Sequence, residues 1–207
     1  MRLHKIAPEY EGRVRLVSRP FALEVYGGGP ANRQEIEQEM WLAALQEPEA
    51  TFKPFGDEWP ATTLPAFEAG WAALRQGEKM GRDFDLRIRQ AFFAEGRNIG
   101  RREVMLDLAR EAGLGMARFS HDFDSGKARE AVLAEGRLGK EKYGVHETPT
   151  IMLGDGTLLK HPMALPQTQD NRVVAVGRLP CCGDGCYAAT RDLFEMAWKH
   201  ADKSQER

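Results

Sequence analysis

The chain has 207 residues, with 29 Lys and Arg against 31 Asp and Glu, and a formal net charge of −2. Acids and bases are mixed along the sequence, which excludes the basic stripe that nucleic-acid binding requires. Apolar runs are too short to span a membrane and the N-terminus lacks a signal peptide's apolar core, so we expect a cytoplasmic protein without nucleic-acid or membrane partners.

The N-terminal region predicts two helices with a strand between them. Residues 2–11 read as a helical segment that ends at Gly12. Residues 14–18 are bulky and partly alternate in polarity, which favours a strand. Asn32 has the position of an N-cap, and Glu35 three residues later completes a capping box, so a second helix is predicted to begin there.

The middle of the chain, to residue 143, predicts a block of helices. Apolar residues recur there at three- and four-residue steps, the spacing of one helix face. Gly113 and Gly144 stand where helices commonly end. The residues expected on buried faces are Leu64, Phe67, Trp71 and Leu74, then Leu86, Ile88, Phe92 and Phe93, then Val104, Met105, Leu108 and Ala112, and finally Ala128, Ala131, Val132 and Leu138.

A hairpin led by proline follows the helices. Residues 150–153 and 157–159 read as two short strands joined by a turn at Asp155-Gly156. Pro149 stands at the first position of a strand, where the missing N–H of proline calls for an explanation. A cis peptide bond between Thr148 and Pro149 is one explanation, and a tight loop with a trans bond is the other.

The C-terminal region carries all three cysteines of the chain, in the sequence Cys181-Cys182-Gly-Asp-Gly-Cys186. Before them, residues 166–171 predict a polar loop and residues 173–176 an extra strand. After them, residues 187–201 predict an amphipathic terminal helix. The order of elements favours an α/β sheet with an inserted helical lobe.

The number and clustering of the cysteines exclude a structural disulfide framework. The intervening glycines allow the loop to bring the sulfurs of Cys181 and Cys186 together as a redox pair, and a place just ahead of the last helix would stabilise the Cys186 thiolate. Our site prediction is this pair, with no metal and no cofactor. Two alternatives stay open, inert loop cysteines and a zinc site with His161 as the nearest further ligand.

Two stretches, which together cover most of the chain, resemble a known family. The first runs from residues 91–99 through the sequence Gly144-Val-His-Glu-Thr-Pro-Thr to the hairpin. The second is residues 13–24, which look like the family's second strand and the loop after it. The chain is similar to the DsbA-like thioredoxin family. More narrowly, it resembles the cytosolic branch of FrnE-type proteins and, more distantly, 2-hydroxychromene-2-carboxylate isomerases. The resemblance implies a thioredoxin-like domain at 1–30 and 144–207 and an inserted helical domain at 31–143.

The N-terminus departs from the family pattern. Members begin with a strand and then a helix carrying Cys-x-x-Cys, whereas residues 1–11 look like the later turns of that helix. The expected explanations are a start codon assigned too late, a remodelled variant, or a strand supplied by a partner chain.

The resemblance implies a thiol–disulfide oxidoreductase that docks an extended peptide at Thr148 and Pro149. Its partners would be peptide or protein thiols, or a small thiol such as glutathione, and a homodimer is left open. The alternatives are a glutathione-dependent isomerase of the same superfamily and a non-catalytic module that binds a peptide or a small molecule.

Overall fold

The computed structural model describes residues 2–27, 29–30, 32–160, 166–170, 172–176, 181 and 184–205. The chain divides into two compact units. The first comprises Met1–Val17, Gln34–Ala50 and Pro149–Arg207, and the second comprises Ser18–Arg33 and Thr51–Thr148. Within the described residues, no helix has the length and apolar character needed to cross a membrane.

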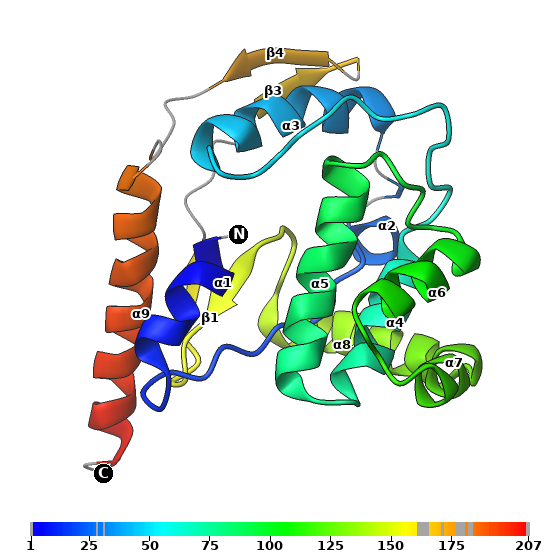
Figure 1. The fold of residues 1–207 in the computed structure, drawn as a ribbon. Helices are drawn as coiled ribbons and strands as arrows, with labels where there is room; N and C mark the ends of the chain where they lie inside the picture. The colour runs from blue at the N-terminus through cyan, green and yellow to red at the C-terminus, as the bar shows by residue number, and fades with distance from the viewer. Residues whose placement is uncertain are drawn as a thin grey trace. The chain divides into compact units, whose positions relative to one another are not determined.

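The first unit combines helices with two small antiparallel hairpins (Figure 1). A glycine with positive φ, Gly12 at +76°, follows its first helical segment, as the sequence predicted. The helix predicted after Asn32 is also present. The elements are α1 (Arg2–Ile6), the 3-10 helix η1 (Ala7–Tyr10), most of α3 (Arg33–Gln46), β1 (Thr150–Met152), β2 (Leu158–Lys160), β3 (Pro166–Gln169), β4 (Arg172–Val176) and α9 (Asp184–Gln205).

The hairpin after Pro149 forms as predicted. In it β1 and β2 pair antiparallel, with Ile151 opposite Leu159. The turn is closed locally, because the Asp155 carboxylate accepts a hydrogen bond of 2.9 Å from the backbone N–H of Thr157. Gly156 supplies the positive φ, +88°, that such a turn requires.

Two details of the predicted strands were wrong. Residues 14–18 form no strand, although their chain is described throughout. A strand needs a neighbour to accept and donate its backbone hydrogen bonds, and β1 pairs with β2 alone among the described strands. The segment 166–171, predicted as a loop, instead contributes β3, which pairs with the predicted strand β4.

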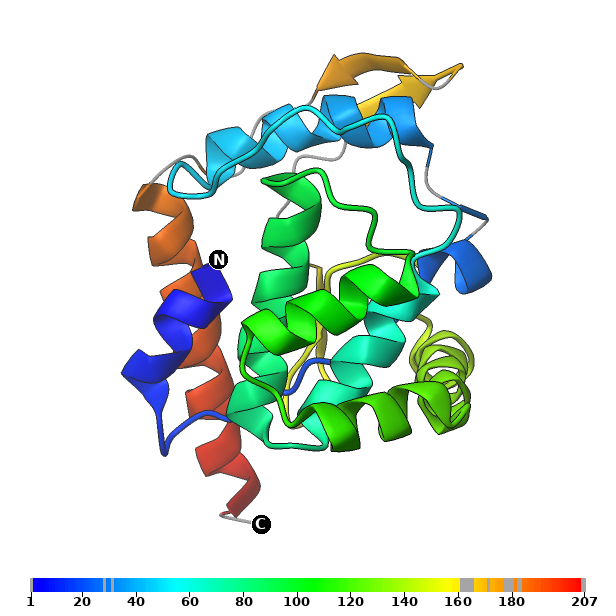
Figure 2. The same ribbon diagram turned by 45° about the vertical axis from the view of Figure 1, so that its right-hand side comes forward.

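The core of the first unit is small. Ile6, Tyr10 and Phe194 are buried together, and the rings of Tyr10 and Phe194 stack with their centroids 5.0 Å apart. This contact fixes α1 and η1 along α9, and both views show the two segments side by side (Figures 1 and 2). The Tyr10 hydroxyl donates to the Glu195 carboxylate at 2.9 Å, and burial together with that hydrogen bond raises the pKa of the Tyr10 phenol.

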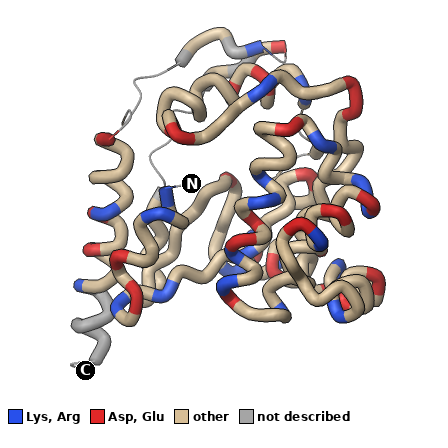
Figure 3. Tube along the Cα trace, in the orientation of Figure 1, with Lys and Arg blue, Asp and Glu red and all other residues tan. Residues whose placement is uncertain are grey.

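The second unit is helical throughout its described elements. They are α2 (Leu23–Tyr26), α4 (Leu64–Leu74), α5 (Glu78–Phe93), α6 (Arg102–Glu111), α7 (Met116–Asp124) and α8 (Lys127–Tyr143). Two of these helices end where predicted, since Gly113 and Gly144 take φ values of +70° and +63°. Acidic and basic residues are interspersed along this unit and along the first (Figure 3).

Helix α4 lies at the centre of the second unit, against α5, α6, α7 and α8. The face it buries differs from the predicted one. Ala69, Ala72 and Ala73 are fully buried, whereas Leu74 is 45% exposed. Small side chains let the neighbouring helix backbones approach closely, so an alanine face is selected when one helix packs against four others.

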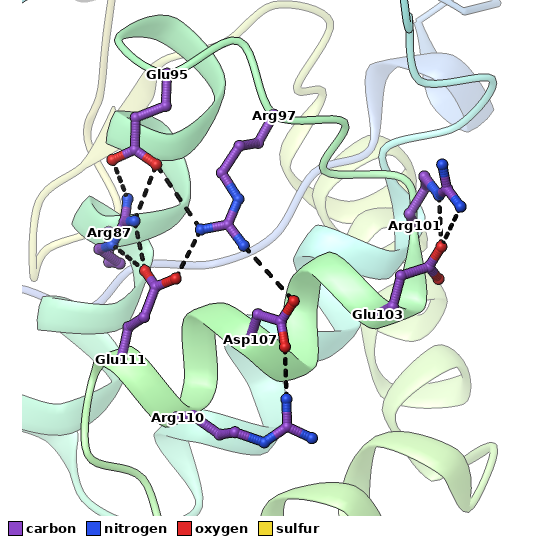
Figure 4. Close-up of polar contacts among 8 residues, drawn as sticks. All are labelled: Arg87, Glu95, Arg97, Arg101, Glu103, Asp107, Arg110 and Glu111. Atoms are coloured by element: carbon purple, nitrogen blue, oxygen red, sulfur yellow. Dashed lines mark hydrogen bonds and ion pairs between the residues drawn. The ribbon is translucent and has the colours of Figure 1, made fainter.

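An ion-pair network joins the end of α5 to α6 (Figure 4). Glu111 accepts hydrogen bonds from Arg97 at 2.8 Å and from Arg87 at 2.5 Å. Arg87 also pairs with Glu95 at 2.8 Å. Hydrogen bonds from Arg97 and Arg87 hold the pKa of the Glu111 carboxyl below its ordinary value.

The compact units do not follow the predicted domain boundaries, because residues 34–50 group with the two ends of the chain. A compact cluster of contacts is not by itself a folding domain. The thioredoxin-like domain at 1–30 and 144–207 and the inserted helical domain at 31–143 therefore stay a prediction.

Candidate functional site

The first unit holds the predicted cysteine pair as a disulfide. Cys181 and Cys186 are bonded, with their Cα atoms 5.0 Å apart. The helix begins earlier than the sequence suggested, so Cys186 is the third residue of α9 and not a residue ahead of it. One sulfur of the pair therefore belongs to the first turn of a long helix, where backbone N–H groups are free and the helix dipole is positive.

The two cysteines differ in their burial. Cys186 is fully buried, whereas Cys181 keeps part of its surface exposed. One helical turn after Cys186, the buried side chain of Thr190 donates a hydrogen bond of 2.8 Å to the Cys186 carbonyl. The disulfide thus joins a partly exposed residue to a fully buried one.

A guanidinium lies beside the sulfur of the partly exposed cysteine, Cys181. Arg2 Nη1 donates to the Cys181 Sγ at 3.6 Å. The Nε of the same side chain donates to Glu47, just past the end of α3. Both side chains are mostly buried, with 11% of Arg2 and 14% of Glu47 exposed. Glu47 therefore holds the cation at the sulfur in surroundings that weaken solvent screening.

A second set of polar contacts joins the same three parts of the chain, which are α1, the segment after α3 and the start of α9. The Tyr187 hydroxyl, in the first turns of α9, donates to Glu49 at 3.2 Å. Lys5 of α1 pairs with Glu49, and its Nζ lies 5.5 Å from the centre of the Tyr187 ring. Together with Arg2 and Glu47, these residues tie α1 and the segment after α3 to the start of α9.

The predicted docking residues precede β1. Thr148 and Pro149 are exposed and lie in a bend, with Thr148 the last residue of the second unit and Pro149 the first of a first-unit segment. Neither is hydrogen-bonded to the cysteine pair among the described residues. Their docking role and the cis peptide bond stay predictions.

The zinc alternative finds no support in the described part of the chain, where no group of three or more His, Cys, Asp and Glu side chains is placed to hold a metal ion. His161 and Cys182 lie outside the described residues. Zinc binds thiolates, and the bonded sulfurs of Cys181 and Cys186 are not thiolates in this state.

Arg2 and Glu47 are site residues that sequence reasoning missed. Arg2 is separated from Cys181 by 179 positions, and neither residue belongs to a spaced motif. The contact depends on the packing of α1 against α9, which the sequence does not encode as a local pattern.

The comparisons with known proteins agree with this architecture. A family model described as thioredoxin matches residues 60–168, more than half of the 207 residues. This chain belongs to the thioredoxin family. The matched segment includes Thr148, Pro149 and the β1–β2 hairpin, and it ends before the cysteine pair.

The thioredoxin-family assignment agrees with solved structures. The cytosolic disulfide reductase DsbM from Pseudomonas aeruginosa, solved with GSH, is similar at 25% identity and a TM-score of 0.58, over 77% of this chain and 81% of that one. Another structure of that reductase covers 94% of this chain and 91% of its own, at 22% identity and the same TM-score. The predicted DsbA-like family and thioredoxin-like α/β fold with a helical insertion are confirmed.

Proposed function

We propose that this protein is a thiol–disulfide oxidoreductase whose redox centre in the first unit is the Cys181–Cys186 pair. One observation carries the proposal: the pair is bonded with one sulfur in the first turn of α9 and the other beside a guanidinium. Membership of the thioredoxin family and the likeness to a disulfide reductase support the same class of reaction.

The physical chemistry of the site suits exchange. A thiolate is the attacking and the leaving species in thiol–disulfide exchange, so groups that stabilise it speed the reaction at neutral pH. A helix N-terminus and a nearby arginine are two such groups. This site offers one of them to each sulfur of the pair.

A small thiol such as glutathione is the partner that we propose for the pair. The related DsbM structure was solved with GSH, and that protein is named a cytosolic reductase. A reductase in a reducing compartment draws its electrons from the thiol pool, so a cytoplasmic location follows from the same proposal. Within the same function, we place the docking of an extended peptide at Thr148 and Pro149.

One observation favours a second candidate, the non-catalytic binding module. The segment that matches the family, residues 60–168, contains no cysteine. A chain that kept the proline-led hairpin only to bind a peptide would match the family over the same residues.

The experiment that separates the two candidates is reduction of a disulfide substrate with glutathione as electron donor. Insulin and a small aromatic disulfide would serve as substrates. We expect turnover by the wild-type chain, and a fall to the uncatalysed rate in the Cys181→Ser, Cys186→Ser double variant, which has neither sulfur of the pair.

Cys182→Ser is the matched control, since it removes a neighbouring thiol and leaves the bonded pair intact. Its activity should stay close to that of the wild type. Activity that survives in the double variant, or wild-type protein that never exceeds the uncatalysed rate, contradicts the proposal. Peptide binding without turnover would favour the binding module instead.

A further inference from the structure

We infer that the two cysteines have unequal roles: Cys181 exchanges with external thiols and disulfides, Arg2 stabilises its thiolate, and Cys186 resolves the mixed disulfide. This inference rests on the proposed function and deepens it. It follows from three differences between the two sulfurs, in access, in neighbouring charge and in secondary structure.

Access comes first. An attacking thiolate must approach a sulfur in line with the bond that it breaks, and Cys186 is fully buried in the first turn of α9. Cys181 precedes the helix and is partly exposed. An external thiol therefore reaches the Sγ of Cys181, and the Sγ of Cys186 is the leaving group.

The charges around the pair are also unequal. Arg2 donates to the Cys181 Sγ, and Glu47 anchors that guanidinium from the other side. The nearby Lys5 is already paired with Glu49. Asp184 lies in the first turn of α9, two residues before Cys186, and its charge opposes a thiolate there. The positively charged neighbour, Arg2, therefore lies beside the sulfur of Cys181.

Helix geometry gives Cys186 its complementary role. As the third residue of α9, its sulfur leaves as a thiolate near free backbone N–H groups. Those groups offset the opposing charge of Asp184. A buried thiolate held at this place is ready to attack the Sγ of Cys181 again.

The exchange balances with a low-molecular-weight thiol as reductant. The thiolate RS⁻ attacks the Sγ of Cys181, a new R–S–S–Cys181 bond forms, and the electron pair of the broken bond goes to Cys186. A second RS⁻ attacks the R sulfur, which releases RSSR and the thiolate of Cys181 beside Arg2. Two thiols are oxidised, the protein disulfide is reduced to two thiolates, and the two protons that the thiols lost go to solvent.

The reduced pair then transfers two electrons to a substrate disulfide. The Cys181 thiolate attacks one substrate sulfur and releases the other as a thiolate. Cys186 attacks the Sγ of Cys181, which re-forms the bond between the two cysteines and releases the second substrate thiolate. Substrate is reduced by two electrons, and the protein pair is oxidised by the same two.

A trapping experiment tests which sulfur exchanges. In a Cys182→Ser background, oxidised glutathione should form a stable mixed disulfide at Cys181 in the Cys186→Ser variant. The Cys181→Ser variant should be modified at least about tenfold more slowly at Cys186. Intact mass and peptide mapping identify the modified residue. Preferential trapping at Cys186 overturns the inference.

Arg2 is tested through the rate of Cys181 alkylation by iodoacetamide against pH, in the Cys182→Ser, Cys186→Ser background. Arg2→Gln should slow alkylation at neutral pH about three- to tenfold and move the midpoint of the pH profile upward, and Arg2→Lys should recover part of the rate. Arg191→Gln is the matched control, because that residue lies on α9 and pairs with Glu9 at 2.8 Å. An unchanged profile in a folded Arg2→Gln variant overturns the role of Arg2.

The outcomes separate this inference from the proposed function. Turnover that is lost in the double variant, with trapping at Cys186, leaves the function standing and refutes the assignment of roles. A wild-type chain without turnover refutes the function itself. If Arg2→Gln fails to fold, the trapping result still decides the roles, and Arg2→Lys, which keeps the charge without the planar guanidinium, tests the nearby cation through the alkylation profile of Cys181 against the wild-type residue.

Discussion

The two compact units are held together in different ways. In the second unit, six described helices surround a core of fully buried side chains that includes Phe84 and Phe119. In the first unit, the buried cluster is Ile6, Tyr10 and Phe194, and the start of α9 is bound by a disulfide and by polar contacts. Helix packing therefore stabilises the second unit, whereas the oxidation state of Cys181 and Cys186 contributes to the stability of the first.

The largest expected effect is on the packed core of the second unit. Phe84 is fully buried and meets Phe119 edge to face, with ring centroids 5.6 Å apart. Phe84→Ala should lower the free energy of unfolding by about 3–5 kcal/mol, because it removes a large buried side chain and leaves a cavity. Urea unfolding followed by circular dichroism measures the loss.

Leu74→Ala is the control for this prediction, since that side chain is 45% exposed on α4. It should cost less than about 1 kcal/mol. A similar loss in both variants would mean that the second unit is not held mainly by its buried core.

Reduction of the Cys181–Cys186 disulfide should lower the stability of the first unit and leave that of the second unchanged. The disulfide closes a short loop, across five positions, so its removal should cost about 2 kcal/mol in the first unit. Hydrogen exchange with and without dithiothreitol should show faster exchange in the second turn of α9, where the N–H groups are hydrogen-bonded within the helix, and unchanged rates in α4 and α5. Faster exchange in α4 on reduction would contradict the contrast between the units.

Dithiothreitol should have no such effect on the Cys181→Ser, Cys186→Ser double variant, which has no bond to lose. This variant separates the loss of the disulfide from a general effect of the reductant. If dithiothreitol changed the hydrogen-exchange rates of this double variant, another thiol would be involved.

A carboxylate cap contributes a smaller effect within the second unit. Glu24 of α2 accepts hydrogen bonds from the backbone N–H groups of Thr63 and Leu64 and from the Thr62 hydroxyl, all at the start of α4. Glu24→Ala should cost about 1–2 kcal/mol in thermal or urea unfolding. Glu24→Gln keeps one acceptor oxygen and should cost less; an equal loss would mean that the charge, and not the cap, carries the effect.

The smallest effect is the pH dependence of the network between α5 and α6. The pKa of Glu111 is lowered in the fold, chiefly by its hydrogen bond from Arg97. A lowered carboxyl pKa contributes stability above the unfolded value and loses it as the pH falls through the folded value. Unfolding free energy should therefore decrease as the pH falls below about 4, the usual range for glutamate.

Glu111→Gln should make this acid slope shallower and cost only a few tenths of a kcal/mol at neutral pH, because 43% of the Glu111 side chain is exposed and water screens the pair. Urea unfolding at a series of pH values measures both quantities. A steeper slope in the variant would contradict the sign derived for Glu111.

Local sequence determined much of the chain. The hairpin after Pro149 needs only its Asp155-Gly156 turn and alternating strands, and the helices need only regular apolar spacing with glycine stops such as Gly113 and Gly144. The spacing of Cys181 and Cys186 was likewise enough to predict their proximity. In each case, the interacting groups are near neighbours in the chain, so short-range geometry sets the outcome.

Tertiary structure decided the rest. Residues 14–18 have a strand-like pattern and form none, since a strand exists only with a partner. Helix α4 buries alanines and leaves Leu74 exposed, because the neighbouring helices choose the face. The contact of Arg2 with Cys181 joins opposite ends of the chain through the packing of α1 on α9. Such contacts depend on the fold as a whole, and no local spacing in the sequence encodes them.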